Sequence, residues 1–339
     1  MVQWYAEKGV SEVKNQTSFA DFEYDNRKRQ TRREKFLDAM DKIIPWKEWV
    51  ALIVPCYPKG KRGRPPRGIE LMLRMVLLQN WFNLSDEGLE DSIYDSYAFR
   101  KFMGINFLEE QVPDATTLCK FRAILNDNGL TEQVFAHVKQ LLDETGKIMH
   151  GGSIVDASII DAPSSTKNKD GKRDPEMHQV KKGNEWYFGE RLHIGVDAGT
   201  GYIHSVDVTA ANVGERDVVP SLIREDDEFV YGDAGYCGIE CREEVINDPH
   251  LSKIDWRINS KKPYRKKNPW KSGPGIYWYK YMEYQKSRVR SKVEYAFFVI
   301  KRVFGYRKVR YRGIEKNRKH GFMLCALADL YMLAQSQPA

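Results

Sequence analysis

The stretch SIVDASIIDA, residues 153–162, marks the point where the pattern of the chain changes. It follows two glycines and is rich in β-branched residues, which is typical of a strand. Between about residues 33 and 146, by contrast, apolar residues recur at helical spacing. The sequence therefore predicts an all-helical N-terminal domain, residues 1–148, and a second domain of different architecture, residues 149–339.

The second domain alternates between strand and helix patterns. Their order is strand, hairpin, helix, strand, helix and strand, at residues 153–162, 191–210, 212–223, 228–236, 238–248 and 253–260. A basic, aromatic insertion at about 261–283 then precedes a last helix, from about residue 285 to 304. This order predicts an α/β fold with one mixed sheet flanked by helices. The polar segment 164–186 shows no apolar period, and we expect a mobile loop there.

The charge is unevenly distributed along the chain. Residues 251–320 hold 22 Lys and Arg against four acids, a net charge of +18, whereas the other 32 basic and 43 acidic residues carry −11. Aromatic residues are interleaved with the basic ones, as in IYWYKYMEY at 276–284, and this mixture suits phosphate contacts and base stacking. A solvated face or tail is the alternative, although disordered basic tails are usually poor in aromatic residues. The block therefore indicates a nucleic-acid partner.

A second basic stretch, KGKRGRPPR at 59–67, contains Arg62, Arg64 and Arg67. Its Arg-Gly-Arg-Pro core resembles an extended arm that lies in the DNA minor groove. The alternative is that its two prolines only begin the following helix.

Three acids lie at positions that suit a metal site. Asp156 lies inside the first strand, where a charge among apolar residues is costly unless something pairs with it. Asp233 directly follows a later strand, and Glu294 lies in the last helix. Ligands of α/β sheets gather at the carboxyl ends of strands, and carboxylates are the hard oxygen ligands that Mg²⁺ or Mn²⁺ prefers.

Each of these acids also has a structural interpretation. Asp156 fits a buried, hydrogen-bonded group, Asp233 fits a turn residue before Ala-Gly, and Glu294 fits an ion-pair partner of Arg290 one turn earlier. Asp197, at the turn of the hairpin, is expected to be structural. The acids that compete for the metal role are Asp161, Asp197, Asp207 and Asp217.

Three ordered motifs carry a resemblance to a known family. They are VDASIIDAPSSTKNKDGKRDPEMHQVKKGNEWYFGERLHIGVDAGTG at 155–201, GDAGYCG at 232–238 and RVRSKVEYAFFVIKRVFGYRKVRYRGIEKN at 288–317. The sequence resembles the transposases of the bacterial insertion sequence five family, which belong to the DDE transposases with an RNase H-like catalytic core. The N-terminal half shares the likeness, so it spans nearly the whole chain.

The resemblance implies the identity of the site residues. Asp156, Asp233 and Glu294 match the catalytic and metal-binding acids of the family, which bind two Mg²⁺ ions, or Mn²⁺ in their place. Related transposases often surround the glutamate with Tyr-x2-Arg-x3-Glu-x6-Lys. Arg290 and Lys301 match that pattern, whereas a serine, residue 287, stands at the tyrosine position.

Helical spacing gives a separate reason for the basic residues near the glutamate. Arg290 lies four residues before Glu294 and Lys301 seven after it, so all three project along one helix face. We therefore expect these two cations to hold phosphates beside the acid. The full set of expected DNA contacts is Arg290, Lys301, Arg288, Lys292, Arg302, Arg62, Arg64 and Arg67.

The activity implied by the resemblance is transposition of double-stranded DNA. Such an enzyme binds transposon ends, cleaves strands with metal-activated water, and joins 3′-hydroxyl ends to target DNA as a homodimer at the cytoplasmic nucleoid. The alternatives are a DNA-binding repressor or decayed transposase without catalysis, and an RNase H-like nuclease that does not join ends. No membrane partner is expected, because the most apolar run, residues 321–334, is too short to span a bilayer.

Overall fold

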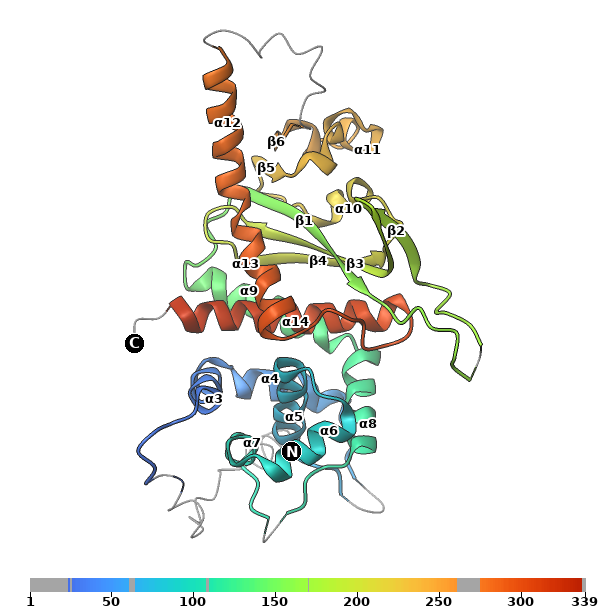
Figure 1. The fold of residues 1–339 in the computed structure, drawn as a ribbon. Coiled ribbons are helices and arrows are strands. Elements are labelled where there is room, and N and C mark those ends of the chain that lie inside the picture. The colour runs from blue at the N-terminus through green and yellow to red at the C-terminus, as the bar shows by residue number, and fades with distance from the viewer. Residues whose placement is uncertain are drawn as a thin grey trace. The chain divides into compact units, whose positions relative to one another are not determined.

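The computed structural model describes residues 24, 26–60, 65–107, 110–169, 171–260 and 275–336. The chain divides into two compact units, Met1–Val134 with Leu330–Ala339, and Phe135–Asp329. Figure 1 shows the elements of each unit. Most of the expected insertion at 261–283, together with Arg62 and Arg64, lies outside the described residues.

The first unit is helical, as predicted. Its helices are α3 (Arg32–Ile43), α4 (Trp46–Ile53), α5 (Ile69–Phe82), α6 (Asp86–Asp95), α7 (Tyr97–Met103), α8 (Ala115–Asp127) and the start of α9 (Leu130–Glu144). Side-chain caps fix where several of them begin. The Thr31 side chain accepts a hydrogen bond from the backbone N of Glu34 at 3.1 Å, and Asp114 accepts one from Thr117 at 2.6 Å.

Helix α5 is the central element of this unit, and it is buried on nearly every side. Met72, Leu73 and Leu77 have no exposed surface. A helix buried all round needs partners for its polar groups, and Arg74 has them: its guanidinium lies 2.6 Å from Asp41 Oδ1 and 2.8 Å from Glu70 Oε1. A single apolar face along α5 would have left one side exposed, so the helix is more deeply buried than its spacing indicates.

The second unit contains a mixed sheet of six strands with the order β2-β3-β1-β5-β6, in which β4 also pairs with β3. The strands are β1 (Gly152–Asp161), β2 (His178–Lys182), β3 (Glu185–Asp197), β4 (Ile203–Ala210), β5 (Phe229–Gly232) and β6 (Asp255–Ile258). β1 pairs antiparallel with β3 and parallel with β5. The predicted α/β fold with one mixed sheet is therefore confirmed, including the hairpin of β3 and β4.

The segment 164–186 departs from the expectation of a loop. Its second half forms β2 and the start of β3, which pair in the register His178↔Gly189 to Lys182↔Glu185. Its first half is tied to the start of a helix near the C-terminus, α14 (Ile314–Ser336), because Asp174 and Glu176 accept hydrogen bonds from the backbone N of Gly313 and Ile314. Polar residues here satisfy the free N–H groups of a helix end, a role that no local period reveals.

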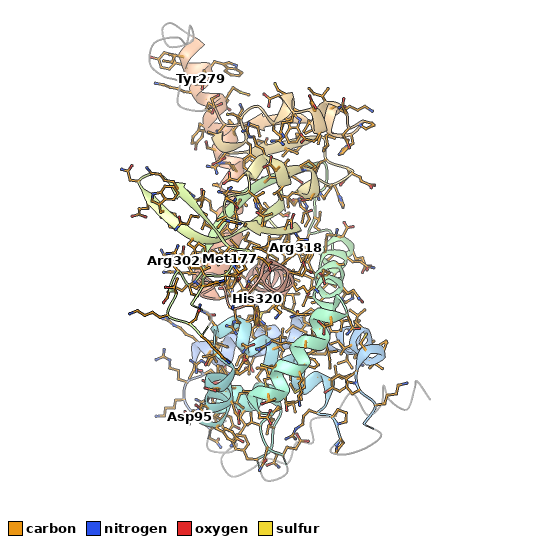
Figure 2. All side chains as sticks on the ribbon, turned by 90° about the vertical axis from the view of Figure 1, so that its right-hand side faces the viewer. Asp95, Met177, Tyr279, Arg302, Arg318 and His320 are labelled. Carbon is orange, nitrogen blue, oxygen red and sulfur yellow. The ribbon has the colours of Figure 1, made fainter. Side chains whose placement is uncertain are left out.

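Helices cover the sheet of the second unit. Helix α10 (Glu215–Leu222) packs its Val218, Val219 and Leu222 into one cluster with Val155 of β1. α14 passes beneath the strands in Figure 1 and lies close to β3 and β4, since a Cβ at Gly321 would lie 3.3 Å from Val208 Cγ2. Two of its residues are labelled in Figure 2. Arg318 forms an ion pair with Asp207 at 3.0 Å, and the ring of His320 packs edge-on against Tyr306. Among the described residues, no helix is long and apolar enough to cross a membrane.

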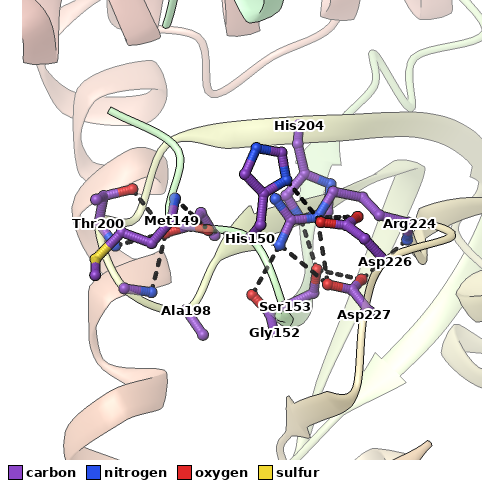
Figure 3. A network of polar contacts seen from close by, with 12 residues as sticks. Met149, His150, Gly152, Ser153, Ala198, Thr200, His204, Arg224, Asp226 and Asp227 are labelled. Carbon is purple, nitrogen blue, oxygen red and sulfur yellow. Dashed lines mark hydrogen bonds and ion pairs between the residues drawn. The ribbon is translucent and has the colours of Figure 1, made fainter. Parts of the chain in front are cut away.

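A buried polar network fixes the start of β1 against the turn that precedes β5 (Figure 3). The Asp227 carboxylate, only 2% exposed, accepts hydrogen bonds from Ser153 Oγ at 2.5 Å and from Arg224 Nη2 at 3.0 Å. The Arg224 guanidinium also donates to the carbonyl of Gly152 at 3.1 Å. At Gly152 only glycine fits, because a Cβ there would lie 1.9 Å from the ring of Phe229.

The same network determines the tautomer of a buried histidine. Ser153 donates its one hydroxyl proton to Asp227, so it must accept from His204 Nε2, which lies 2.8 Å away. His204 Nδ1 then accepts from the hydroxyl of Ser205 at 2.9 Å. Burial lowers the pKa of His204 to about 3, which is consistent with a neutral ring throughout the physiological range.

We predict that Asp227→Ala lowers the free energy of unfolding by about 3 kcal/mol, because it leaves a buried guanidinium without its main anion. The matched control is Asp226→Ala, one residue away, whose side chain is 43% exposed, binds His150 and lies 3.7 Å from the same Arg224. Its loss should cost less than about 1 kcal/mol. Guanidinium chloride unfolding of both variants measures the difference, and equal losses would contradict the importance of the buried network.

Glu190 of β3 is a buried acid with an altered pKa. It is 1% exposed, and its Oε1 accepts a hydrogen bond from the Tyr306 hydroxyl at 3.0 Å. Burial raises its pKa to about 8, against the opposing effect of that hydrogen bond. Between the pKa of an unfolded glutamate, about 4.3, and about 8, the folded protein therefore holds a proton that the unfolded chain releases. Stability contributed by this group falls as pH rises through that window.

We expect Glu190→Gln to flatten the pH dependence of stability, since glutamine does not titrate. From pH 5.5 to 7.5 the free energy of unfolding of the wild type should decrease by up to about 2.7 kcal/mol more than that of the variant, at about 1.4 kcal/mol per pH unit. Denaturant unfolding at the two pH values measures this. The exposed Glu185 of the same strand provides the control Glu185→Gln, which should keep the wild-type slope.

Candidate active site

Two of the predicted acids lie on neighbouring parallel strands. β1 and β5 pair in the register Ile154↔Tyr231, and Asp156 and Asp233 each lie two residues further along. Asp233 is the first residue after β5, and its Oδ1 accepts a hydrogen bond from the backbone N of Gly235 at 2.7 Å. One oxygen of Asp233 therefore has the role expected of a turn residue. The pairing of β1 with β5 places this turn next to Asp156.

Asp156 is largely buried and lies in an environment of mixed charge. Its Oδ1 accepts a hydrogen bond from the backbone N of Ala157 at 2.8 Å, and its Oδ2 lies 3.8 Å from Arg290 Nη1. Burial is the main effect that raises its pKa to about 6, the negative charges of Asp233 and Glu215 add to it, and the amide and Arg290 oppose it. A carboxylate in this position gains from any additional cation.

Glu215 is a member of this cluster that the sequence analysis did not single out. It begins α10, and its Oε1 lies 3.3 Å from Arg191 Nη1. Its other oxygen faces the turn after β5: a Cβ at Gly235 would lie 2.9 Å from Glu215 Oε2 and 2.8 Å from Asp233 Oδ1. The available signal was an acid at the start of the helix that leads into β5, in the segment where only Asp217 was considered.

Glu294 lies on a different element from Asp156, Asp233 and Glu215. It lies exposed in the first turn of α13 (Lys292–Phe298). In the described part of the chain, no three His, Cys, Asp or Glu side chains are grouped closely enough to hold a metal ion. The structure thus places the two aspartates on paired strands and the glutamate on a helix.

The helix that was expected to carry Glu294 is interrupted. α12 (Gly275–Arg290) ends just before α13, and α13 continues into a π-helical turn, Val299–Val303. The predicted helix from about 285 to 304 is therefore present as helical turns, but it is interrupted at Ser291 and ends in a π-helical turn. Turns of the π type occur frequently at functional sites.

Arg290 and Lys301 both reach β1, as their shared helix face predicts. Arg290 lies beside Asp156, and Lys301 Nζ donates a hydrogen bond to the carbonyl of Ile159 at 2.7 Å. Burial lowers the pKa of Lys301. The Lys301 ammonium therefore holds the helix to the strand.

The other predicted DNA contacts are placed differently from one another. Lys292 Nζ donates to the carbonyls of Ala198 and Gly199, each at 2.7 Å, so its charge binds the hairpin turn. Arg288 and Arg302 are exposed, and Figure 2 labels Arg302. The remaining contacts belong to the arm at 59–67, where Arg67 is half-buried and Arg62 and Arg64 lie outside the described residues.

Comparison with known protein families decides the class of the protein. A family model described as a transposase DDE domain matches residues 148–330, more than half of the chain. The chain belongs to the DDE transposase family. A second model, described as a transposase domain (DUF772), matches residues 25–123. No solved structure matches the chain significantly.

Membership confirms the main predictions about class and fold. A DDE domain implies an RNase H-like fold, and the mixed sheet flanked by helices agrees with it. Transposase domains also imply DNA binding. The narrower resemblance to the insertion sequence five family is compatible with both matches.

The residues of the cluster suit the divalent metal ions that this family typically uses. Carboxylate oxygen is the ligand type that Mg²⁺ and Mn²⁺ prefer. The raised pKa of Asp156 shows that its anionic form lacks full compensation from the protein alone. A cation between Asp156 and Asp233 would supply that compensation, so the donor set fits a metal.

Lys301 and Arg302 are neighbouring cations with the same predicted role, but among the described contacts only Lys301 makes one that should stabilise the fold. Lys301→Met should lower the free energy of unfolding by about 1–2 kcal/mol, because the carbonyl of Ile159 loses its partner. Arg302→Met, the exposed neighbour, should change it by less than about 0.5 kcal/mol. Thermal and denaturant unfolding of the two variants test this, and equal stability of both proteins would show that the Lys301 contact contributes nothing.

Proposed function

We propose that this protein transposes an insertion sequence: it binds terminal inverted repeats, cleaves DNA strands, and joins 3′-hydroxyl ends to target DNA by transesterification. The observation that carries the proposal is the pairing of β1 with β5, which places Asp156 beside the turn at Asp233. We assign DNA-end binding and dimerisation to residues 1–148, catalysis to residues 149–339, and a homodimer to the synaptic complex.

The proposed metal ligands are Asp156, Asp233 and Glu294. They would hold two Mg²⁺ ions, or Mn²⁺, which activate a water or 3′-hydroxyl and stabilise the leaving oxygen when bound. The chain itself supplies the surrounding groups. The Arg290 guanidinium beside Asp156 is suited to hold a phosphate oxygen next to the reacting centre.

Exposed aromatic residues support a DNA-binding role for α12 and α13. Tyr277 and Trp278 of α12 are 77% and 67% exposed, and the Trp278 ring stacks on Tyr281 at 5.6 Å. On α13, next to Glu294, the exposed rings of Tyr295 and Phe298 are stacked at 6.1 Å. Apolar rings held in water beside basic residues are suited to stacking on unpaired bases.

We expect Asp156→Ala, Asp233→Ala and Glu294→Ala each to reduce strand cleavage by at least about 100-fold, because each removes a ligand of the metal ions that would stabilise charge at the reacting phosphate. Binding of the transposon end should remain measurable. The assay combines the full-length protein with a labelled end, Mg²⁺ and a plasmid target. Asp255→Ala is the control, since this exposed acid on β6 pairs only with Arg257 in the described contacts.

The outcomes separate the rival functions. Full cleavage by the Glu294→Ala protein would remove that residue from the site. Cleavage by the wild type without joining would indicate a nuclease, and end binding without nicking under any divalent metal would indicate a repressor or a decayed enzyme.

A further inference from the structure

Tyr236 is a buried tyrosine whose hydroxyl has no hydrogen-bond partner among the described residues. The side chain has no exposed surface. Its ring packs beneath Gly232, where a Cβ would lie 3.1 Å from Tyr236 Cδ2, and its backbone N donates to the carbonyl of Asp233 at 3.1 Å. A buried polar group without a partner is rare in folded proteins, and an absent water or ion is a common explanation.

The surroundings of this hydroxyl identify what is absent. Tyr236 lies three residues after Asp233 in the same turn and shares a buried cluster with Val155, the neighbour of Asp156. Burial raises its pKa, and the charges of Asp156, Glu215 and Asp233 add to that effect. The remaining buried neighbours, such as Val155 and Val218, are apolar. If the tyrosine served only to fill the core, phenylalanine would do so without the cost of an unpaired hydroxyl.

Glu215 is held so that one oxygen remains directed at the same place. Arg191, itself 9% exposed, binds Glu215 Oε1 and also donates to the carbonyl of Val213 at 3.0 Å. The guanidinium therefore fixes the glutamate from behind, while Oε2 faces the turn that carries Asp233. An acid that only stabilised its helix end would not need a buried arginine to orient it.

We propose that Glu215 and Tyr236 bind the outer side of the divalent metal centre formed by Asp156 and Asp233. Tyr236 donates its hydroxyl proton to a water that the cation retains, and Glu215 accepts a hydrogen bond from another such water. This inference rests on the proposed function. It agrees with the tendency of Mg²⁺ to keep several waters.

Both are positioning residues, because they act on the metal centre through waters. Outer partners of metal ligands orient the ligands and set their basicity, and their removal typically weakens metal binding about 10- to 100-fold. The hydroxyl of Tyr236 should therefore lower stability in the metal-free protein and increase affinity for the metal. Removing the hydroxyl of a purely structural tyrosine would not raise stability while it weakened metal binding.

The experiment measures Mn²⁺ binding to the full-length protein by isothermal titration calorimetry, and thermal unfolding without divalent metal. Tyr236→Phe should unfold at the wild-type temperature or above it, and should bind Mn²⁺ about 10- to 100-fold more weakly. Glu215→Gln, which keeps an oxygen for Arg191, should show a similar loss of affinity. Strand cleavage should decrease in both, with partial recovery at raised Mn²⁺ concentration.

Matched controls exist for each substitution. Tyr231→Phe removes a hydroxyl that accepts from Arg257 Nη1 at 2.9 Å, and Asp217→Asn changes an acid in the same turn of α10 that pairs with Arg242. Both should bind Mn²⁺ within about twofold of the wild type. A loss of affinity in the controls equal to that in Tyr236→Phe and Glu215→Gln would overturn the inference.

Asp156→Asn and Asp233→Asn separate this inference from the proposed function. If these two lose Mn²⁺ binding while Tyr236→Phe and Glu215→Gln bind as the wild type does, the outer positions are wrong and the metal centre stands. If all four variants bind Mn²⁺ normally, the metal centre itself is wrong and the inference is overturned with it.

Discussion

The second unit is arranged around one costly placement, the carboxylate of Asp156 within a largely buried strand. A charge there requires compensation, and the parallel pairing of β1 with β5 limits what can supply it. The pairing brings a second acid, Asp233, towards the first, which increases the cost further. The positive charge of Arg290, whose Nη1 lies 3.8 Å from Asp156 Oδ2, offsets part of this cost. The buried network of Asp227 keeps the two strands in register and so maintains this arrangement.

The sequence predicted what depends on local pattern. Period-two alternation located β1 and the hairpin of β3 and β4, and an acid directly after a strand located Asp233. It missed features that depend on distant neighbours. In the sequence, Glu215 is an ordinary acid at a helix start. Its role depends on Gly235 and Arg191, which lie beside it only in the folded structure. The inward turn of Lys301 depends on the carbonyl of Ile159, which lies 142 residues away in the chain.

The basic block has two physical roles in the structure. Part of its charge lies within the fold: Lys292 binds the carbonyls of a turn, Lys301 binds a strand, and Arg290 faces an acid. The other part, including Arg288 and Arg302, is exposed and available to phosphates. Among the described residues, the cations that bind groups of the fold are therefore less available to a polyanion than the exposed ones.

The two roles bear on the order in which ligands bind. Asp156, Asp233 and Glu215 carry negative charge at the centre, and their electrostatic effects on one another show that the protein alone does not neutralise it. Without a metal these carboxylates would repel a DNA phosphate that approached the centre, although Arg290 and the exposed cations attract it. Two divalent cations against three carboxylates would reverse the sign of the centre and allow the phosphate to approach. On this assignment cation binding and engagement of the scissile phosphate are thermodynamically coupled, and each should strengthen the other by the same factor.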